Sequence, residues 1–209
     1  MKNILIIFFV FLFSFKVISC SKKDSGSSST STDSDGTTNS CFSTSISSRQ
    51  LARSSNDYAF GVATDLSGNV YVAGGTNGGL DGNTNAGNTD LFVVKYSSSG
   101  TKQWTKQFGS SSRDSANVFA TDSSGNIYVT GTTYWELDGN TSAGKADLFV
   151  VKYNSSGTKQ WTNQLGTWDT DFANGVATDS LGNVYVTGST YRSLDGNTSA
   201  GNADLFVVK

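Results

Sequence analysis

The chain has 209 residues and a formal net charge of −2, with 23 glycines and neither proline nor histidine. Because histidine is absent, the usual general base at neutral pH and the commonest transition-metal ligand are missing, so any catalysis would rest on carboxylates, tyrosine or lysine. The basic residues form no stripe or run, which argues against a nucleic-acid partner.

The first 19 residues have the pattern of a signal peptide. Lys2 precedes an apolar run at residues 4–15, which would rise only about 18 Å as a helix and is too short to span a bilayer. We therefore expect an exported protein. Residues 17–20, Val-Ile-Ser-Cys, resemble a bacterial lipobox, and the resemblance implies that Cys20 becomes the lipidated first residue of the mature chain. The alternative is an ordinary secretory leader with an incidental Cys20.

A polar segment follows the leader. Residues 21–40 contain no apolar side chain, so they cannot bury enough surface to fold. We predict that residues 20–42 are the lipidated cysteine and a flexible tether about 25 Å long on average. By resemblance to lipoprotein sorting, Ser21 implies an outer-membrane lipoprotein of the bacterial cell envelope. Cys41 is either a small half-buried residue or a free thiol that pairs two chains.

Residues 43–209 repeat with a period of 57. The sequence Leu-Asp-Gly-Asn-Thr and the sequence Asp-Leu-Phe-Val-Val-Lys each occur three times at this spacing, starting at Leu80, Leu137 and Leu194 and at Asp90, Asp147 and Asp204. A constant period over three copies indicates a tandem array in which each copy is one supersecondary unit. The units cover about 52–108, 109–165 and an incomplete 166–209.

The middle unit predicts four strands, at residues 116–121, 126–131, 147–153 and 159–165, because these segments are rich in β-branched and aromatic residues. Residues 122–125 and 154–157 join them in pairs and end in glycine, as antiparallel hairpins require. A four-stranded antiparallel sheet that repeats at this length indicates an all-β fold built of β-propeller blades. The alternative is a β-helix or another solenoid.

Three segments of the repeat resemble a known family. Gly-Asn-Val-Tyr-Val-Thr-Gly at 182–188, the strand at 147–153 and Lys-Gln-Trp-Thr-Asn-Gln-Leu at 159–165 look like the SBBP repeat, a bacterial β-propeller repeat. The resemblance covers nearly all of the predicted folded region. It implies a propeller and implies little about activity.

The blade count leaves the predicted propeller incomplete. Residues 47–51 align with 104–108 and 161–165, although Ser47 replaces a tryptophan. The chain therefore contains one separate fourth strand, two whole blades and a third blade that stops after its third strand. Since rings close with four to eight blades, we hypothesise either a homodimer that forms a six-bladed ring or a truncated copy of a longer array.

The Asp-Gly-Asn-Thr segments are candidates for a metal site. Carboxylate and amide oxygens are groups that Ca²⁺ accepts, but the same residues are common in turns. The turn interpretation predicts no cofactor, and the metal interpretation predicts Ca²⁺ at Asp81, Asn83, Asp138, Asn140, Asp195 and Asn197.

Positions that differ between the copies are better candidates for a functional site. Residues 119–152 and 176–209 are identical at 27 of 34 positions, and two adjacent differences are Trp135-Glu136 against Arg192-Ser193. The loop before the first strand also varies. Both loops should lie on one face of a propeller, where exposed aromatic and arginine side chains favour recognition. Neutral drift in exposed loops is the alternative. The candidate binding face comprises Arg113, Tyr134, Trp135, Glu136, Trp168, Asp169, Tyr191 and Arg192.

Three functions follow from this reading. The first is a lipid-anchored, non-enzymatic module that binds a protein or glycan partner through the variable loops. The second is a structural scaffold of the envelope or a truncated, non-functional array. The third is a glycan-acting enzyme with Glu136, the only glutamate, and Asp169 as paired carboxylates, but the sequence reveals neither the separation nor the environment that such a pair requires.

Overall fold

A computed structural model describes residues 30–32, 38–40, 50–51 and 55–209. The chain divides into two compact units, Met1–Gln50 and Leu51–Lys209. The first unit contains strands β1 (Thr30–Thr32) and β2 (Thr38–Ser40), which pair antiparallel. The predicted leader at 1–19, lipidated Cys20, Cys41 and Ser47 lie outside the described residues, as does most of the predicted tether at 20–42. No helix long and apolar enough to cross a membrane occurs in the part of the chain that the structure describes.

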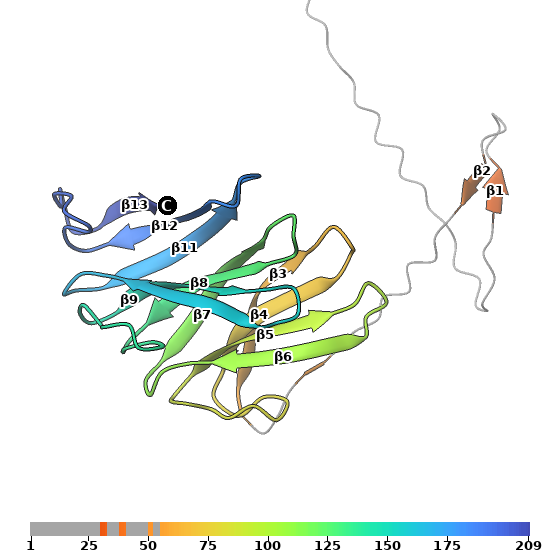
Figure 1. The fold of residues 1–209 in the computed structure, drawn as a ribbon, viewed down its shortest axis with the longest axis horizontal. Coiled ribbons are helices and arrows are strands. Elements are labelled where there is room, and N and C mark those ends of the chain that lie inside the picture. Colours follow the sequence, from red (N-terminus) through yellow and green to blue (C-terminus); the bar gives the residue numbers. More distant parts are fainter. Residues whose placement is uncertain (1–29, 33–37, 41–49, 52–54) are drawn as a thin grey trace, which may run out of the picture. The chain divides into compact units, whose positions relative to one another are not determined.

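The second unit consists of three antiparallel sheets that follow one another along the chain (Figure 1). Blade 1 contains β3 (Asp57–Thr64), β4 (Val70–Thr76), β5 (Asp90–Tyr96) and β6 (Lys102–Phe108). Blade 2 contains β7 (Asp114–Thr121), β8 (Ile127–Thr133), β9 (Asp147–Tyr153) and β10 (Lys159–Leu165). Blade 3 contains only β11 (Asp171–Thr178), β12 (Val184–Thr190) and β13 (Asp204–Val208). The predicted all-β array of propeller-type blades is confirmed, with two four-stranded sheets and one three-stranded sheet among the described residues.

The predicted strand boundaries are right for the third and fourth strands of the middle blade and shifted for the first and second strands. Strands β9 and β10 match the predicted ranges. Strand β7 begins at Asp114, two residues earlier than predicted, and β8 runs from Ile127 to Thr133 rather than from 126 to 131. The cause is the ladder between them, which extends to the pair Asp114 and Thr133. Both residues are buried polar groups, which a search for apolar runs does not include.

The hairpin turns have the predicted chemistry. Asp122 Oδ1 accepts hydrogen bonds from the backbone N–H of Ser124 and Asn126, both at 2.9 Å. Gly125 has a φ of 75°, which lies in the left-handed region that glycine adopts without strain. Asn154 Oδ1 likewise accepts from the Ser156 N–H at 3.1 Å. The side chain that starts each turn therefore satisfies the backbone of the turn.

Blade 2 is covered on both sides. One apolar cluster joins blade 1 to blade 2 and includes Tyr71, Leu91, Phe149 and Val151. A second cluster joins blade 2 to blade 3 and includes Leu148, Val150, Val186 and Phe206. Every residue of β8 is buried, as expected for a strand whose sheet is covered on both faces. The middle blade thus supplies most of the core.

Polar contacts also join successive blades at their entry loops. Thr89 of blade 1 forms a parallel bridge with Arg113, and Ala146 of blade 2 forms one with Thr170. The Asp114 carboxylate is buried and accepts hydrogen bonds from the Ser110 N–H at 2.6 Å and the Ser110 hydroxyl at 2.9 Å. Asp171 has the same two contacts with Thr167. Asp114 and Asp171 therefore stabilise the entry loops of their blades.

Candidate binding face

The two variable patches predicted from the sequence lie next to each other in the structure. We call them the loop face: the loops after the second strands, residues 134–136 and 191–193, and the loops before the first strands, residues 110–113 and 167–170. The Tyr134 N–H donates to the Arg113 carbonyl at 3.1 Å, and the Tyr191 N–H donates to the Thr170 carbonyl at 3.3 Å. Each second-strand loop is therefore tied to the entry loop of its own blade.

Trp168 and Arg192 form the centre of the loop face in blade 3. The Arg192 guanidinium carbon lies 4.3 Å from the centroid of the Trp168 ring, within cation–π range. The indole is 62% exposed. The arginine therefore contacts the ring face and restrains it, while most of the tryptophan stays exposed.

Asp169 links this pair to blade 2. Its carboxylate accepts from Lys145 Nζ at 3.0 Å and from Arg192 Nη2 at 3.1 Å. The hydrogen bond from Lys145, together with the positive charges of Lys145 and Arg192, holds the pKa of Asp169 below its usual value. Asp169 is thus an ionised anchor for two cations. It pairs with these cations and not with Glu136, the partner that the glycan-hydrolase hypothesis requires.

Blade 2 presents different side chains at the equivalent positions. Trp135 is 55% exposed, and its backbone is fixed because its carbonyl accepts from Thr133 Oγ1 at 2.9 Å and Gln164 Nε2 at 3.2 Å. Glu136 and Arg113 are exposed. Tyr134 and Tyr191 are also among the exposed large side chains. The loops that define the loop face contain all eight predicted residues, and among these Arg192 is in direct contact with Trp168 and Asp169.

The candidate Ca²⁺ residues lie in turns. Asp81, Asp138 and Asp195 have φ values of 57°, 57° and 50°. The Asp81 carboxylate pairs with Lys102, and that of Asp138 pairs with Lys159. Asn83, Asn140 and Asn197 donate their side-chain amides to the carbonyls of Leu80, Leu137 and Leu194 at 2.8, 2.8 and 3.0 Å. Among the described residues no group of three or more potential metal ligands occurs.

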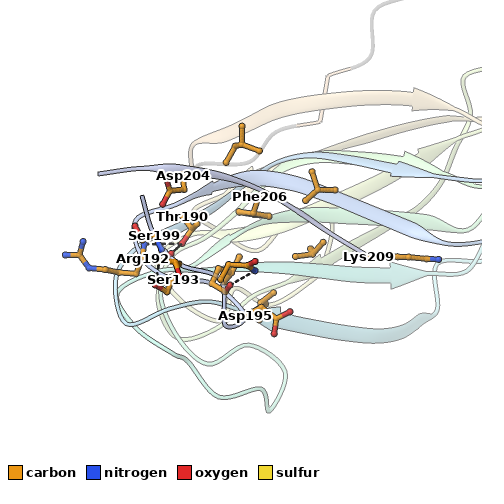
Figure 2. A pocket seen from close by; sticks show the side chains of 15 residues that line it. Thr190, Arg192, Ser193, Asp195, Ser199, Asp204, Phe206 and Lys209 are labelled. Atoms are coloured by element: carbon orange, nitrogen blue, oxygen red, sulfur yellow. Dashed lines mark hydrogen bonds between the residues drawn. The ribbon is translucent and has the colours of Figure 1, made fainter. Parts of the chain in front are cut away.

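A groove in blade 3 is a feature that the sequence does not reveal directly. It has a volume of about 500 Å³ and runs along β13 and the loop between β12 and β13. Figure 2 shows Asp195, Asp204 and Phe206 among the side chains along it, with Arg192 and Lys209 at opposite ends. We call it the fourth-strand groove, because its counterparts in blades 1 and 2 hold strands β6 and β10.

The fold and the repeat agree with a family of known proteins. The family model for the SBBP beta-propeller repeat matches residues 48–81, 103–134 and 160–194. The chain belongs to the SBBP beta-propeller repeat family. The second and third matches extend from the fourth strand of one blade through the second strand of the next, so the SBBP unit bridges two blades.

Two curated proteins show more distant similarity to this SBBP protein. The regulatory protein FlaEY of Caulobacter vibrioides is 28% identical over an alignment of 148 residues that covers 64% of this chain and 16% of FlaEY. An uncharacterized WD repeat-containing protein of Acanthamoeba polyphaga mimivirus is 28% identical over an alignment of 144 residues that covers 58% of this chain and 10% of the viral protein. The SBBP chain therefore corresponds to a small part of each relative.

Proposed function

We propose that this SBBP protein is a non-enzymatic binding module that recognises a protein or glycan partner through its loop face. The observation that carries the proposal is the exposure of Trp135 and Trp168 on adjacent blades, where the repeat itself does not require a tryptophan. Tryptophan, tyrosine and arginine are the residues that most often dominate binding energy.

Rigid support for these side chains favours binding over drift. Arg192 stacks on Trp168 and is itself paired with Asp169, while Gln164 and Thr133 fix the backbone of Trp135. Side chains held in one conformation lose less entropy when a partner binds. The resemblance to a regulatory protein and to a WD repeat-containing protein also agrees with an interaction role rather than a catalytic one.

The pairing of Asp169 speaks against the enzyme hypothesis. A general acid needs an environment that raises its pKa, whereas Lys145 and Arg192 lower the pKa of Asp169. We therefore propose that Glu136 and Asp169 contribute charge to a binding surface and do not act as a catalytic pair.

Binding of the labelled protein to arrays of proteins and glycans tests the proposal. We expect Trp135→Ala and Trp168→Ala each to weaken binding at least tenfold, as for a residue at the centre of an interface. Leu181→Ala is the matched control. Leu181 is also highly exposed, but it lies in the β11–β12 turn, at the opposite end of the strand from Trp168. If the tryptophan variants bind as the wild type does, the scaffold function stands instead.

We also propose that Cys20 is lipidated and anchors the module in the bacterial cell envelope, at the outer membrane. The support is the leader and the lipobox-like residues 17–20. Labelling of cells with palmitate should mark the wild-type protein and not the Cys20→Ala variant. If neither protein is labelled, the module is secreted and unanchored.

A further inference from the structure

The charged side chains at the loop face are unequally exposed. Lys145 and Arg192 share the Asp169 carboxylate, but the Asp169 side chain is only 14% exposed, whereas those of Lys145 and Arg192 are 66% and 41% exposed. The shared anion is therefore shielded, while both of its cations are accessible. A partner that approaches the junction of blades 2 and 3 meets positive charge.

Blade 2 adds two charges that have no such partner. Arg113 and Glu136 are both exposed, and neither belongs to an ion pair of the described residues. Together with Lys145 and Arg192, the loop face thus presents three exposed cations and one exposed carboxylate. The whole chain has a net charge of −2, so the face has the opposite sign from the chain. Such a local field favours the approach of an anionic partner.

The blade itself does not require these cations. Lys145 is replaced by asparagine in both other copies of the repeat, at Asn88 and Asn202, and Arg113 is replaced by threonine at Thr170. The described blades form with either residue at these positions. The positive charge is therefore a property of this surface rather than of the fold.

An exposed ring and a cation lie together in blade 3. Trp168 contacts the guanidinium of Arg192, and the adjacent residue Asp169 pairs with Lys145. The indole offers a large apolar surface. A ligand that binds here meets an apolar ring and positive charge at the same place.

A sugar ring with an acidic substituent matches this combination. The C–H groups on one face of the sugar ring pack on an indole, and the acidic substituent of the same ring reaches a cation. An acidic amino-acid side chain carries the charge but has no comparable apolar face. The site in blade 3 therefore favours an acidic sugar over an acidic peptide.

Blade 2 offers a second site of the same kind. Trp135 is exposed, and its neighbour Tyr134 donates its N–H to the Arg113 carbonyl. The ring and the cation thus come from two loops that are bonded to each other. A glycan chain repeats its unit, so two sites on adjacent blades can bind successive segments of one chain and gain avidity.

We propose that the loop face binds an acidic glycan, with its sugar rings on Trp135 and Trp168 and its anionic groups at Arg113, Lys145 and Arg192. The ligand class rests on the proposed function, because it concerns the same surface and the same tryptophans. Added salt weakens this binding, because charges at the surface are screened beyond about 8 Å at physiological ionic strength.

Five polymers separate the contributions of ring and charge. Polygalacturonate and dextran sulfate carry sugar rings with anionic groups. Methyl-esterified polygalacturonate and dextran carry the rings without the charge, and polyglutamate carries carboxylates without sugar rings. We expect the purified protein to bind polygalacturonate or dextran sulfate at least about tenfold more tightly than the uncharged counterpart and polyglutamate. The preferred polymer identifies the anionic group as carboxylate or sulfate.

Substitutions that occur naturally in the other blades test the charges. Lys145→Asn should weaken binding to the preferred polymer about three- to tenfold at low salt. Glu136→Ser, which introduces the residue that blade 3 has at Ser193, should strengthen binding, because it removes the exposed negative charge. Lys102→Asn is the control. Lys102 also pairs with an aspartate, Asp81, but it lies at the start of β6, at the opposite end of the strand from the loop face.

Four results would overturn the proposal. Equally tight binding of polyglutamate would indicate an acidic peptide, and equally tight binding of the uncharged polymers would indicate a neutral glycan. Binding that neither Lys145→Asn nor Glu136→Ser changes would exclude a role for these charges. If none of the five polymers binds while the arrays reveal a partner that depends on Trp135 and Trp168, the ligand class is wrong and the proposed function stands. If the arrays also reveal no such dependence, both fail.

Discussion

The strand Asp-Leu-Phe-Val-Val-Lys has the same sequence in blade 2 and blade 3, at residues 147–152 and 204–209, but a different environment. Leu148 is 2% exposed and Leu205 is 85% exposed; Val150 is 9% exposed and Val207 is 64% exposed. Blade 3 covers the first pair, and no described residue of this chain covers the second to the same extent. Identical local sequence thus forms the same strand, while the neighbouring blade determines how much that strand contributes to stability.

The largest loss of stability is expected from a substitution at the buried residue Leu148. Leu148→Ala should lower the free energy of unfolding by about 2–5 kcal/mol, because it removes apolar surface and leaves a cavity between blades 2 and 3. Leu205→Ala should change it by less than about 0.5 kcal/mol, because Leu205 is 85% exposed. Chemical denaturation measures both values. Equal effects of the two substitutions on the free energy of unfolding would contradict the difference in burial between Leu148 and Leu205.

The next largest loss of stability is expected at Gln164 in the fourth strand of blade 2. Gln164→Ala removes an acceptor for the Leu137 N–H and donors to the Trp135 carbonyl and Asp147. Because the partners are half-buried or buried, we expect a loss of about 2–4 kcal/mol. Gln160→Ala, four residues earlier on the same strand, is the control, because the Gln160 amide contacts only the Thr158 carbonyl. Thermal unfolding of the two variants separates the loss of the Gln164 hydrogen bonds from the loss of a side chain in general. A loss of the same size in both variants would show that the hydrogen bonds of Gln164 have no special role.

A smaller, pH-dependent effect is expected from the β7–β8 turn. Burial works against the charged form of Asp122, but hydrogen bonds from Asn126, Tyr128 and Ser124 outweigh it and lower the pKa of the carboxyl below 3.8. A depressed pKa in the folded state gives stability that is complete above the unfolded pKa and is lost as the pH falls through the folded value.

Asp122→Asn should therefore be less stable than wild type by about 1 kcal/mol at pH 6, and the difference should shrink as the pH falls below about 3.8. The equivalent Asp179 also has a lowered pKa, caused first by the hydrogen bond from the Asn183 amide. Asp179→Asn should thus show the same direction of pH dependence in blade 3. Unfolding curves at a series of pH values test both variants, and a difference that grows on acidification would contradict the assignment.

A small effect on stability is also expected at the loop face. Trp168→Ala should cost less than about 1 kcal/mol, because the ring is largely exposed and its contact with Arg192 is a surface cation–π pair. Its denaturation midpoint should stay close to that of the control Leu181→Ala. A loss comparable to that of Leu148→Ala would mean that Trp168 belongs to the core and would remove it from the proposed binding face.

Much of the fold could be predicted from the sequence because each blade repeats local signals. The turn from Asp122 to Gly125 and the strand from Asp147 to Tyr153 follow from residue types whose backbone preferences are local. The start of β7 and the end of β8 could not be predicted from apolar runs, because Asp114 and Thr133 are polar and pair with each other across the ladder. The convergence of the variable loops follows from antiparallel topology, but the contact of Trp168 with Arg192 depends on side-chain packing.

The sequence alone determined the period, the four-strand pattern and the turn chemistry, since these depend on spacing and on local conformational preference. Only the tertiary structure decided which copies of a repeated residue are buried, that Asp169 pairs with Lys145 and Arg192, and that Leu51 packs on blade 1. The physical reason is that burial and ion pairing depend on neighbours far away in the chain. Leu91, Leu148 and Leu205 occupy the same position of the repeat, and only the first two meet a following blade.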